Sequence, residues 1–81
     1  MYYPRLRDLR NDNDMAQKQV ADYLGIDQRV YSTYETGKRE MPARFFVELA
    51  KLYGTSTDYI YGLTNSFAPY PREQKPRNKR Q

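Results

Sequence analysis

The chain has 81 residues, no cysteine, no histidine and a formal net charge of +4. That length fits one small domain with little room for an enclosed active site. The missing residue types exclude disulfides, thiolate zinc sites and histidine base chemistry, so we expect neither an enzyme nor a cofactor. No apolar run is long enough to span a bilayer, and the first residues lack the apolar core of a signal peptide. We therefore expect no membrane association and a cytoplasmic location.

The positive charge is concentrated at one end of the chain. Residues 1–64 carry nine Lys/Arg and nine Asp/Glu, whereas residues 65–81 carry five cations and one anion. The second segment is also rich in proline and poor in aliphatic residues, so it cannot offset the entropy of ordering. We predict a folded domain over 1–64 and a flexible, disordered basic tail over 65–81. The tail either contacts phosphates or only keeps the chain soluble, and both readings stay open.

Helical spacing begins near the first residues. Pro4 suits a first helical position, and leucines at 6 and 9 share one face, which predicts a helix over about 4–12. A second apolar stripe predicts a helix over about 16–24, and Gly25 then fits the position after a helix end. Asp27 is a good N-cap for a third helix over about 28–35. Three residues between two short helices set them at roughly 90–120°, the geometry of a helix-turn-helix.

Two more helices complete the predicted fold. Pro42 opens a fourth helix over about 42–53, and Ser56 or Thr57 starts a short fifth helix that runs to Tyr61. No alternating strand pattern of useful length is present, so the predicted fold is all-α, a compact five-helix bundle. Five tyrosines are expected at or near core positions, rather than on a surface that stacks on the bases of single-stranded nucleic acid. They are Tyr23, Tyr31, Tyr34, Tyr53 and Tyr59.

One face of the third helix is polar without being highly charged. Gln28 with Ser32, and Arg29 with Thr33, form two i, i+4 pairs opposite the apolar side. Glutamine, arginine and hydroxyl side chains are the groups that hydrogen-bond base edges in the major groove. Periodicity alone leaves an ordinary solvated face equally open, because motifs of this kind have false positives.

Longer motifs resemble one known family. They are RLRDLR at 5–10, MAQKQVADYLGIDQRVYSTYETGKRE at 15–40, Pro42, ELAKLYG at 48–54 and DYIYGL at 58–63. Together they cover about three quarters of the chain and are similar to the lambda-repressor/Cro-type (Xre-like) helix-turn-helix family. One departure is Ala16, which stands where Ser or Thr usually caps the second helix, so Asp14 or water must substitute.

The resemblance implies a role for each matching position. Base reading is implied for Gln28, Arg29, Ser32 and Thr33, with contacts to the DNA backbone or flanking groups by Gln17, Lys38, Arg39 and Arg44. It also implies a partly buried ion pair between Arg10 and Glu35. A dimer surface would lie around Tyr59, Ile60, Tyr61 and Leu63, although Ile60 and Leu63 fit the monomer core equally well.

The implied function is sequence-specific binding of double-stranded DNA by a transcriptional regulator, with a repressor as the favoured form. A single helix-turn-helix reads few base pairs, so we expect a homodimer on a palindromic operator. The alternative is an antitoxin-type interaction module with a protein partner that also regulates its own genes.

Overall fold

The computed structural model describes residues 1–69 and contains five helices in that range. They are α1 (Pro4–Asp12), α2 (Gln17–Leu24), α3 (Gln28–Glu35), α4 (Ala43–Tyr53) and α5 (Thr57–Tyr61). Every predicted helix is present, and each boundary differs from the prediction by one residue at most. The all-α prediction is confirmed, since the described residues contain no strand. The part of the predicted tail from 70 to 81 lies outside the described residues.

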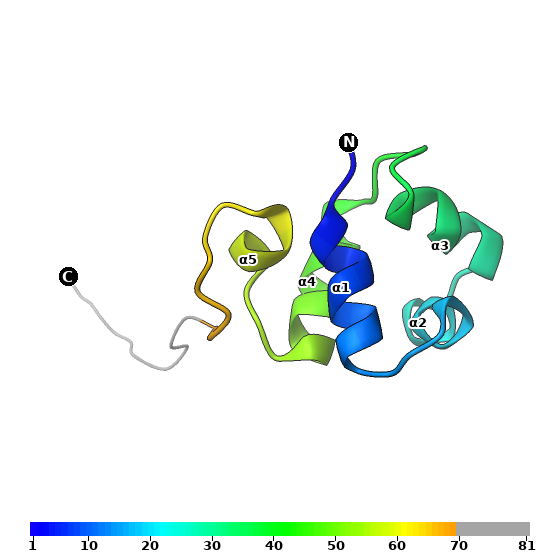
Figure 1. Cartoon of the computed structure of the whole chain (residues 1–81). Helices are drawn as coiled ribbons and strands as arrows, with labels where there is room; N and C mark the ends of the chain where they lie inside the picture. The colour runs from blue at the N-terminus through cyan, green and yellow to red at the C-terminus, as the bar shows by residue number, and fades with distance from the viewer. Residues whose placement is uncertain (70–81) are drawn as a thin grey trace.

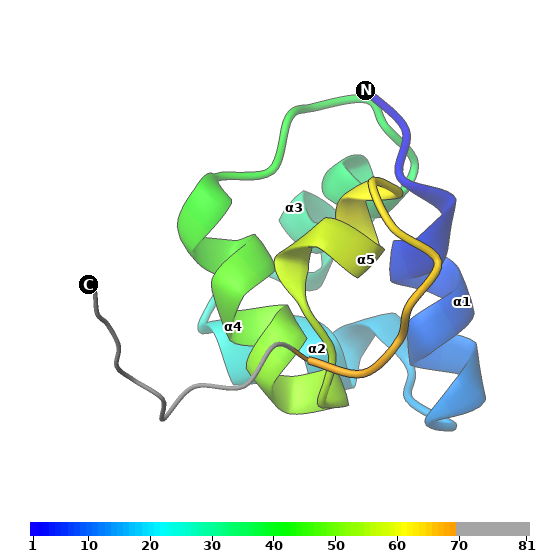
Figure 2. The ribbon, with the colours of Figure 1, turned by 90° about the vertical axis from the view of Figure 1, so that its left-hand side faces the viewer.

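Helix α1 lies between α5 and the pair α2 and α3 (Figure 1). This helix contacts both α3 and α5, while α2 packs on α3 and α4 packs on α5. The helix-turn-helix pair therefore occupies one end of the domain and α5 the other. Seen from the α5 end, α5 lies in front with α4 and α1 on its two sides (Figure 2).

The core forms where the apolar faces of all five helices meet. The buried apolar residues are Leu6, Leu9, Val20, Ala21, Tyr31, Met41, Phe45, Phe46, Leu49, Ala50, Tyr53 and Ile60. An aromatic cluster closes the side next to α5, where the Phe46 ring stacks on Tyr61 at 4.2 Å and meets the edge of Tyr3 at 5.1 Å, both between ring centroids. Such contacts add about 0.5–1.5 kcal/mol each beyond area burial.

The prediction for Tyr23 is wrong. Its side chain is 45% exposed, and its hydroxyl only approaches the Glu48 carbonyl at 3.4 Å. The contact face of α2 is made by Val20, Ala21 and Leu24, and residue 23 lies roughly 100° around the helix from the centre of that stripe. The ring therefore lies on the surface between α2 and α4 rather than in the core.

The start of α2 uses an unusual cap. The Ala16 N–H donates to Oε1 of Gln19 at 2.7 Å, and the Ala16 carbonyl accepts from the Gln19 N–H at 3.0 Å. Alanine has no side-chain acceptor, so only the returning half of a capping box is present. No side chain, that of Asp14 included, accepts from the first N–H groups of α2 among the described residues, so the structure does not show Asp14 in the role of the missing cap.

The residues after α5 fold back onto the helices. The Arg5 guanidinium donates to the carbonyls of Tyr59 and Thr64 and to Oδ1 of Asn65, and it lies 4.0 Å from the centroid of the Tyr59 ring. The Phe67 ring meets the edge of that tyrosine at 5.4 Å between centroids. The packed part of the chain therefore extends past the predicted boundary at residue 64, to about residue 67.

Candidate nucleic-acid interface

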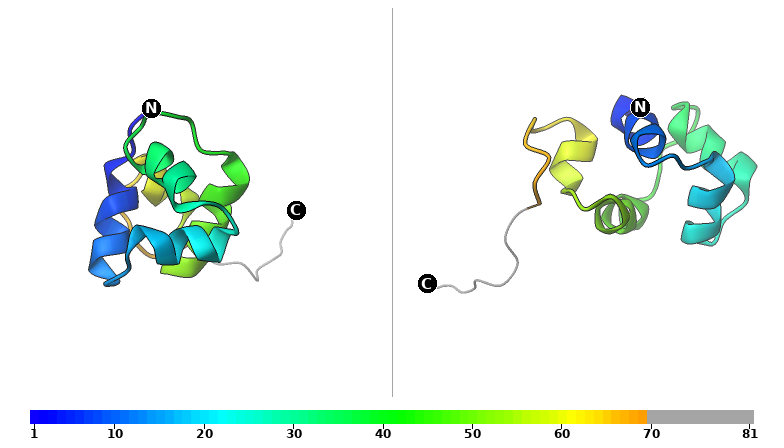
Figure 3. Two further views of the ribbon diagram at one scale, coloured as in Figure 1. Left: turned by 90° about the vertical axis from the view of Figure 1, so that its right-hand side faces the viewer. Right: turned by 60° about the horizontal axis from the view of Figure 1, so that its bottom comes forward.

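The turn between α2 and α3 is built by its local sequence. Gly25 has φ +74°, in the left-handed region where glycine is favoured, and the Ile26 N–H returns to the Ala21 carbonyl at 3.0 Å. Asp27 then accepts from the Arg29 N–H at 2.7 Å as the N-cap of α3. From the side opposite α5, α3 lies in front above α2, with α1 and α4 at the two sides (Figure 3). The helix pair thus presents α3 at the surface.

Exposure differs among the four predicted base-reading residues. Gln28 and Arg29 are exposed, the arginine side chain to 93%, whereas Ser32 and Thr33 are half-buried. The Thr33 hydroxyl donates to the Val30 carbonyl at 2.6 Å, so toward a ligand it offers only its oxygen lone pair and its methyl group. The two residues at the start of α3 are therefore the most accessible of the four.

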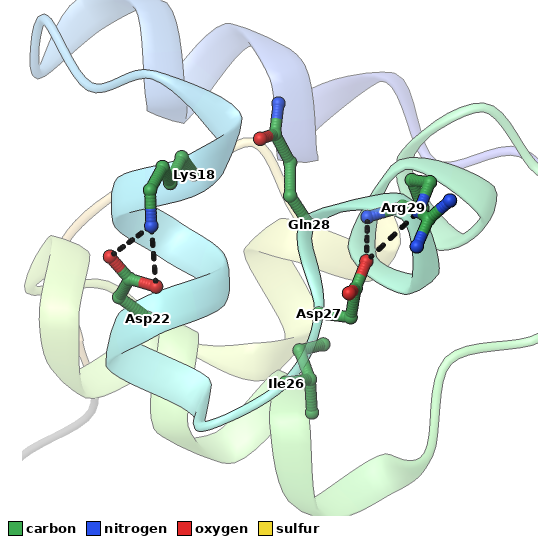
Figure 4. A pocket seen from close by; sticks show the side chains of 6 residues that line it. All are labelled: Lys18, Asp22, Ile26, Asp27, Gln28 and Arg29. Carbon is green, nitrogen blue, oxygen red and sulfur yellow. Dashed lines mark hydrogen bonds and ion pairs between the residues drawn. The ribbon is translucent and has the colours of Figure 1, made fainter.

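A shallow groove of about 480 Å³ runs beside the start of α3 (Figure 4). Lys18 and Asp22 of α2 form one wall, where they pair at 3.2 Å. Asp27 and Arg29 lie on the opposite side, with Oδ1 of the aspartate 3.5 Å from Nε of the arginine. Sequence analysis missed this second contact because it treated Asp27 only as a cap.

The Arg10–Glu35 ion pair is bidentate and mostly buried. Arg10 Nε lies 2.8 Å from Oε2 of Glu35, and Nη2 lies 2.9 Å from Oε1, while the carboxylate is 4% exposed. Burial would raise the pKa of Glu35, but hydrogen bonds from Arg10 and Gln17 outweigh it and leave that pKa below its usual range. The remaining arginine nitrogen, Nη1, donates to the Met15 carbonyl at 2.9 Å, so α1, α3 and the loop before α2 are tied together.

Gln17 belongs to this ion-pair network as well as to the predicted interface. Its Nε2 donates to Oε1 of Glu35 at 3.2 Å. Because a carboxylate only accepts hydrogen bonds, the amide orientation is fixed with its oxygen away from Glu35. The side chain thus offers an acceptor beside α3, a feature that sequence reasoning did not anticipate.

Two tyrosine hydroxyls are buried near the same network. Tyr31 and Tyr53 are 0% and 6% exposed, and neither hydroxyl makes a hydrogen bond of normal geometry among the described residues. Burial, reinforced by the Glu35 charge, raises the pKa of Tyr53 to about 12, and it raises that of Tyr31 further. The Tyr31 ring is therefore held in the core by packing. Its hydroxyl also helps to lower the pKa of Glu35.

The predicted backbone-contact residues lie on the loop after α3 and at the start of α4. Lys38, Arg39 and Arg44 are all exposed. The loop leaves α3 through Gly37, which has φ +83°, and a Cβ there would come within 3.1 Å of the Tyr2 backbone. The Arg39 N–H donates to the Thr33 carbonyl at 3.0 Å, which ties the loop to α3. These cations therefore flank the exposed end of the domain that carries α3.

The predicted dimer surface separates into buried and exposed residues. Ile60 is 1% exposed and packs in the monomer core, which is the alternative that the sequence left open for it. Tyr59 and Tyr61 are half-buried against Arg5 and Phe46. Leu63 is 76% exposed and is the only one of the four left open.

These features define a helix-turn-helix domain with a polar second helix, and the comparisons agree. The family model described as helix-turn-helix matches residues 6–60. The chain belongs to the helix-turn-helix family, of the lambda-repressor/Cro type. No solved structure matches it. Within residues 1–69, no helix has both the length and the apolar character needed to cross a bilayer.

Several curated proteins are similar to this chain. The uncharacterized HTH-type transcriptional regulator YobD of Bacillus subtilis is 39% identical over 75 residues, which are 93% of this chain and 65% of YobD. The cryptic phage CTXphi transcriptional repressor RstR of Vibrio cholerae is 35% identical over 54 residues, 67% of this chain and 49% of RstR. The regulator ImmR of B. subtilis is 34% identical over 58 residues, 72% of this chain and 46% of ImmR. The chain thus spans about half to two thirds of these relatives.

Proposed function

We propose that the protein is a sequence-specific, double-stranded DNA-binding transcriptional regulator that inserts α3 into the major groove. The single observation that carries the proposal is the exposed polar start of α3, where Gln28 and Arg29 extend from a helix held by the turn and by the Arg10–Glu35 pair. Membership in a family whose named relatives are transcriptional regulators supports the same function.

Each part of the interface has its own role in the proposal. Gln28 and Arg29 read base edges, since glutamine and arginine bind adenine and guanine through paired hydrogen bonds. Ser32 and Thr33 contact bases or the nearby backbone from deeper on the same face. The predicted phosphate contacts come from Lys38, Arg39 and Arg44, and Gln17 offers its oxygen to a donor beside α3. Phosphate contacts set position, while base contacts set sequence preference.

A repressor that occupies a palindromic operator as a homodimer is the form we favour. One α3 covers too few base pairs for high specificity, and half-sites one helical turn apart, roughly 34–36 Å, solve this for related motifs. Among the relatives named above, RstR is described as a repressor. A protein with this role works in the cytoplasm, where bacterial DNA lies. The relatives named above are all regulators, so the antitoxin alternative is not favoured.

The decisive experiment is selection of bound sequences from a random duplex pool at two salt concentrations. We expect one short motif, palindromic or a half-site, to be enriched at both salts. Phosphate contacts weaken as salt rises, so enrichment by charge alone disappears at the higher concentration. Enrichment of no motif at either salt contradicts the proposal.

A further inference from the structure

The same carboxylate binds both the backbone and the side chain of Arg29. Oδ1 of Asp27 accepts from the Arg29 N–H at 2.7 Å and lies 3.5 Å from Arg29 Nε. Figure 4 shows both interactions on one oxygen. The terminal nitrogens, Nη1 and Nη2, have no partner among the described residues. The end of the guanidinium fork that remains open is thus the end away from Asp27.

That arrangement suits recognition of one base. Guanine offers N7 and O6 side by side in the major groove, and an arginine binds them with two parallel N–H groups. An arginine held at Nε loses less freedom when its other nitrogens bind, because its fork is already oriented. The pair is exposed in the free protein and contributes little to stability there. The interaction between Asp27 and Arg29 strengthens when the wall of the DNA major groove excludes water from it.

The carboxylate also has an effect on every DNA sequence. The Asp27 carboxyl is negative at neutral pH like any ordinary aspartate, and the hydrogen bond from the Arg29 N–H lowers its pKa further. At 56% exposure beside the α3 surface, it faces the negative potential of any duplex. Sequences that give Arg29 its acceptors offset this repulsion, and unrelated sequences do not. A charge of this kind acts against wrong partners.

We propose that Asp27 is a positioning residue for base recognition, which holds the Arg29 fork toward one base edge and lowers affinity for unrelated DNA. The proposal rests on the proposed function and adds a residue to which only capping had been assigned. Asp22 provides a matched control, because it is a carboxylate in the same groove, 65% exposed, that pairs with Lys18 instead of Arg29.

The test compares Asp27→Asn, Asp22→Asn and the wild type. Asparagine caps helices as well as aspartate, so Asp27→Asn removes the charge and keeps the cap. Each protein is titrated with the selected duplex, with duplexes changed at each base pair in turn, and with an unrelated duplex. For Asp27→Asn we expect discrimination at one base pair to fall about fivefold or more, with tighter binding to the unrelated duplex and an unchanged melting temperature.

A second comparison tests whether Asp27 acts through Arg29. In an Arg29→Ala background, Asp27→Asn should cause no further loss of discrimination at that base pair. An equal loss of discrimination in Asp22→Asn would show that any negative charge in this groove has the same effect, and it would overturn the proposal. Unchanged discrimination in Asp27→Asn, with a discriminating wild type, overturns it as well and leaves the proposed function intact. A wild type that does not discriminate overturns both.

Discussion

Glu35 at the end of α3 receives both Nε and Nη2 of Arg10 from α1, at 2.8 and 2.9 Å. The same Glu35 also accepts from Gln17 at the start of α2. One carboxylate thus joins three helices, including both helices of the turn motif. The angle at which α3 is presented therefore depends on a charge that is almost fully buried.

Removal of one member of this pair should destabilise the fold strongly. Arg10→Met leaves the Glu35 carboxylate buried without its cation, which costs about 3–5 kcal/mol. The double variant Arg10→Met/Glu35→Leu should recover much of that loss, because no unpaired charge remains. Urea unfolding followed by circular dichroism measures all three free energies. Additive losses in the double variant would show that the two charges are not coupled.

Acid should weaken the protein through the same group. The pKa of Glu35 in the folded state lies below its ordinary value of 4.5, so its contribution to stability is present above that value. As pH falls from about 4.5 through the lowered pKa, that contribution is lost. Glu35→Gln should therefore show a flatter stability curve over this range, although it is less stable at neutral pH. Identical slopes in both proteins would assign acid unfolding to other carboxylates.

Alkali should weaken the protein through a buried phenol. Because the folded pKa of Tyr53 is raised from 10.0 to about 12, the protein keeps a proton that the unfolded chain releases, and stability falls between these two pH values. Tyr53→Phe should reduce this dependence without abolishing it, because burial also raises the pKa of Tyr31. The variant's stability at neutral pH should be nearly unchanged, since the Tyr53 hydroxyl has no hydrogen-bond partner to lose within residues 1–69. Thermal melts from pH 8 to 12, with Tyr2→Phe as an exposed control, test both statements.

The two kinds of DNA contact should respond differently to mutation. Arg29→Ala should cost about 1–3 kcal/mol on the preferred sequence and relax preference at one base position. Lys38→Ala should weaken binding to all sequences alike and lower the log–log salt slope by about 0.9. Fluorescence anisotropy on a duplex panel at several salt concentrations separates these effects. Identical behaviour of the two variants across all sequences contradicts the base-reading role.

Leu63 is the residue on which to test the proposed dimer. Leu63→Asp should lower the apparent affinity for a palindromic duplex by about 100-fold and leave half-site binding unchanged, because linked sites gain affinity from simultaneous binding. Val47→Asp is the matched control, an exposed apolar residue of α4 that receives the same charge. Equal effects of both variants, or sedimentation of a monomer on the full operator, would contradict a dimer at this surface.

Caps and spacing were enough to predict the helices. Gly25 and Asp27 mark the turn through local backbone chemistry, and the predicted ends of α2 and α3 agree with the structure to within one residue. The apolar residues of α4 recur at helical spacing, and Phe46 and Leu49 on that face are buried in the core. These features depend on neighbours in the sequence.

The errors concern contacts between distant segments. The bonds of Arg5 to Thr64 and Asn65 join residues about 60 positions apart, and no pattern around either end indicates them. The environments of Ile60 and Leu63 likewise depend on how α5 packs on α4 and α1. The prediction of a core position for Tyr23 failed because α2 buries only one apolar stripe against its neighbours, and Tyr23 lies outside that stripe. Tertiary packing, rather than local preference, decides such positions.

The hydrogen bonds of Arg5 to Thr64 and Asn65 fix the point at which the backbone leaves the domain. Residues 64–67 are held against α5, at the end of the molecule opposite α3 (Figures 1 and 3). Any sequence joined after this point starts on the side opposite the proposed DNA-binding surface. A different attached portion, such as an oligomerising or ligand-sensing unit, could thus be joined here without any change to α3 and the residues around it.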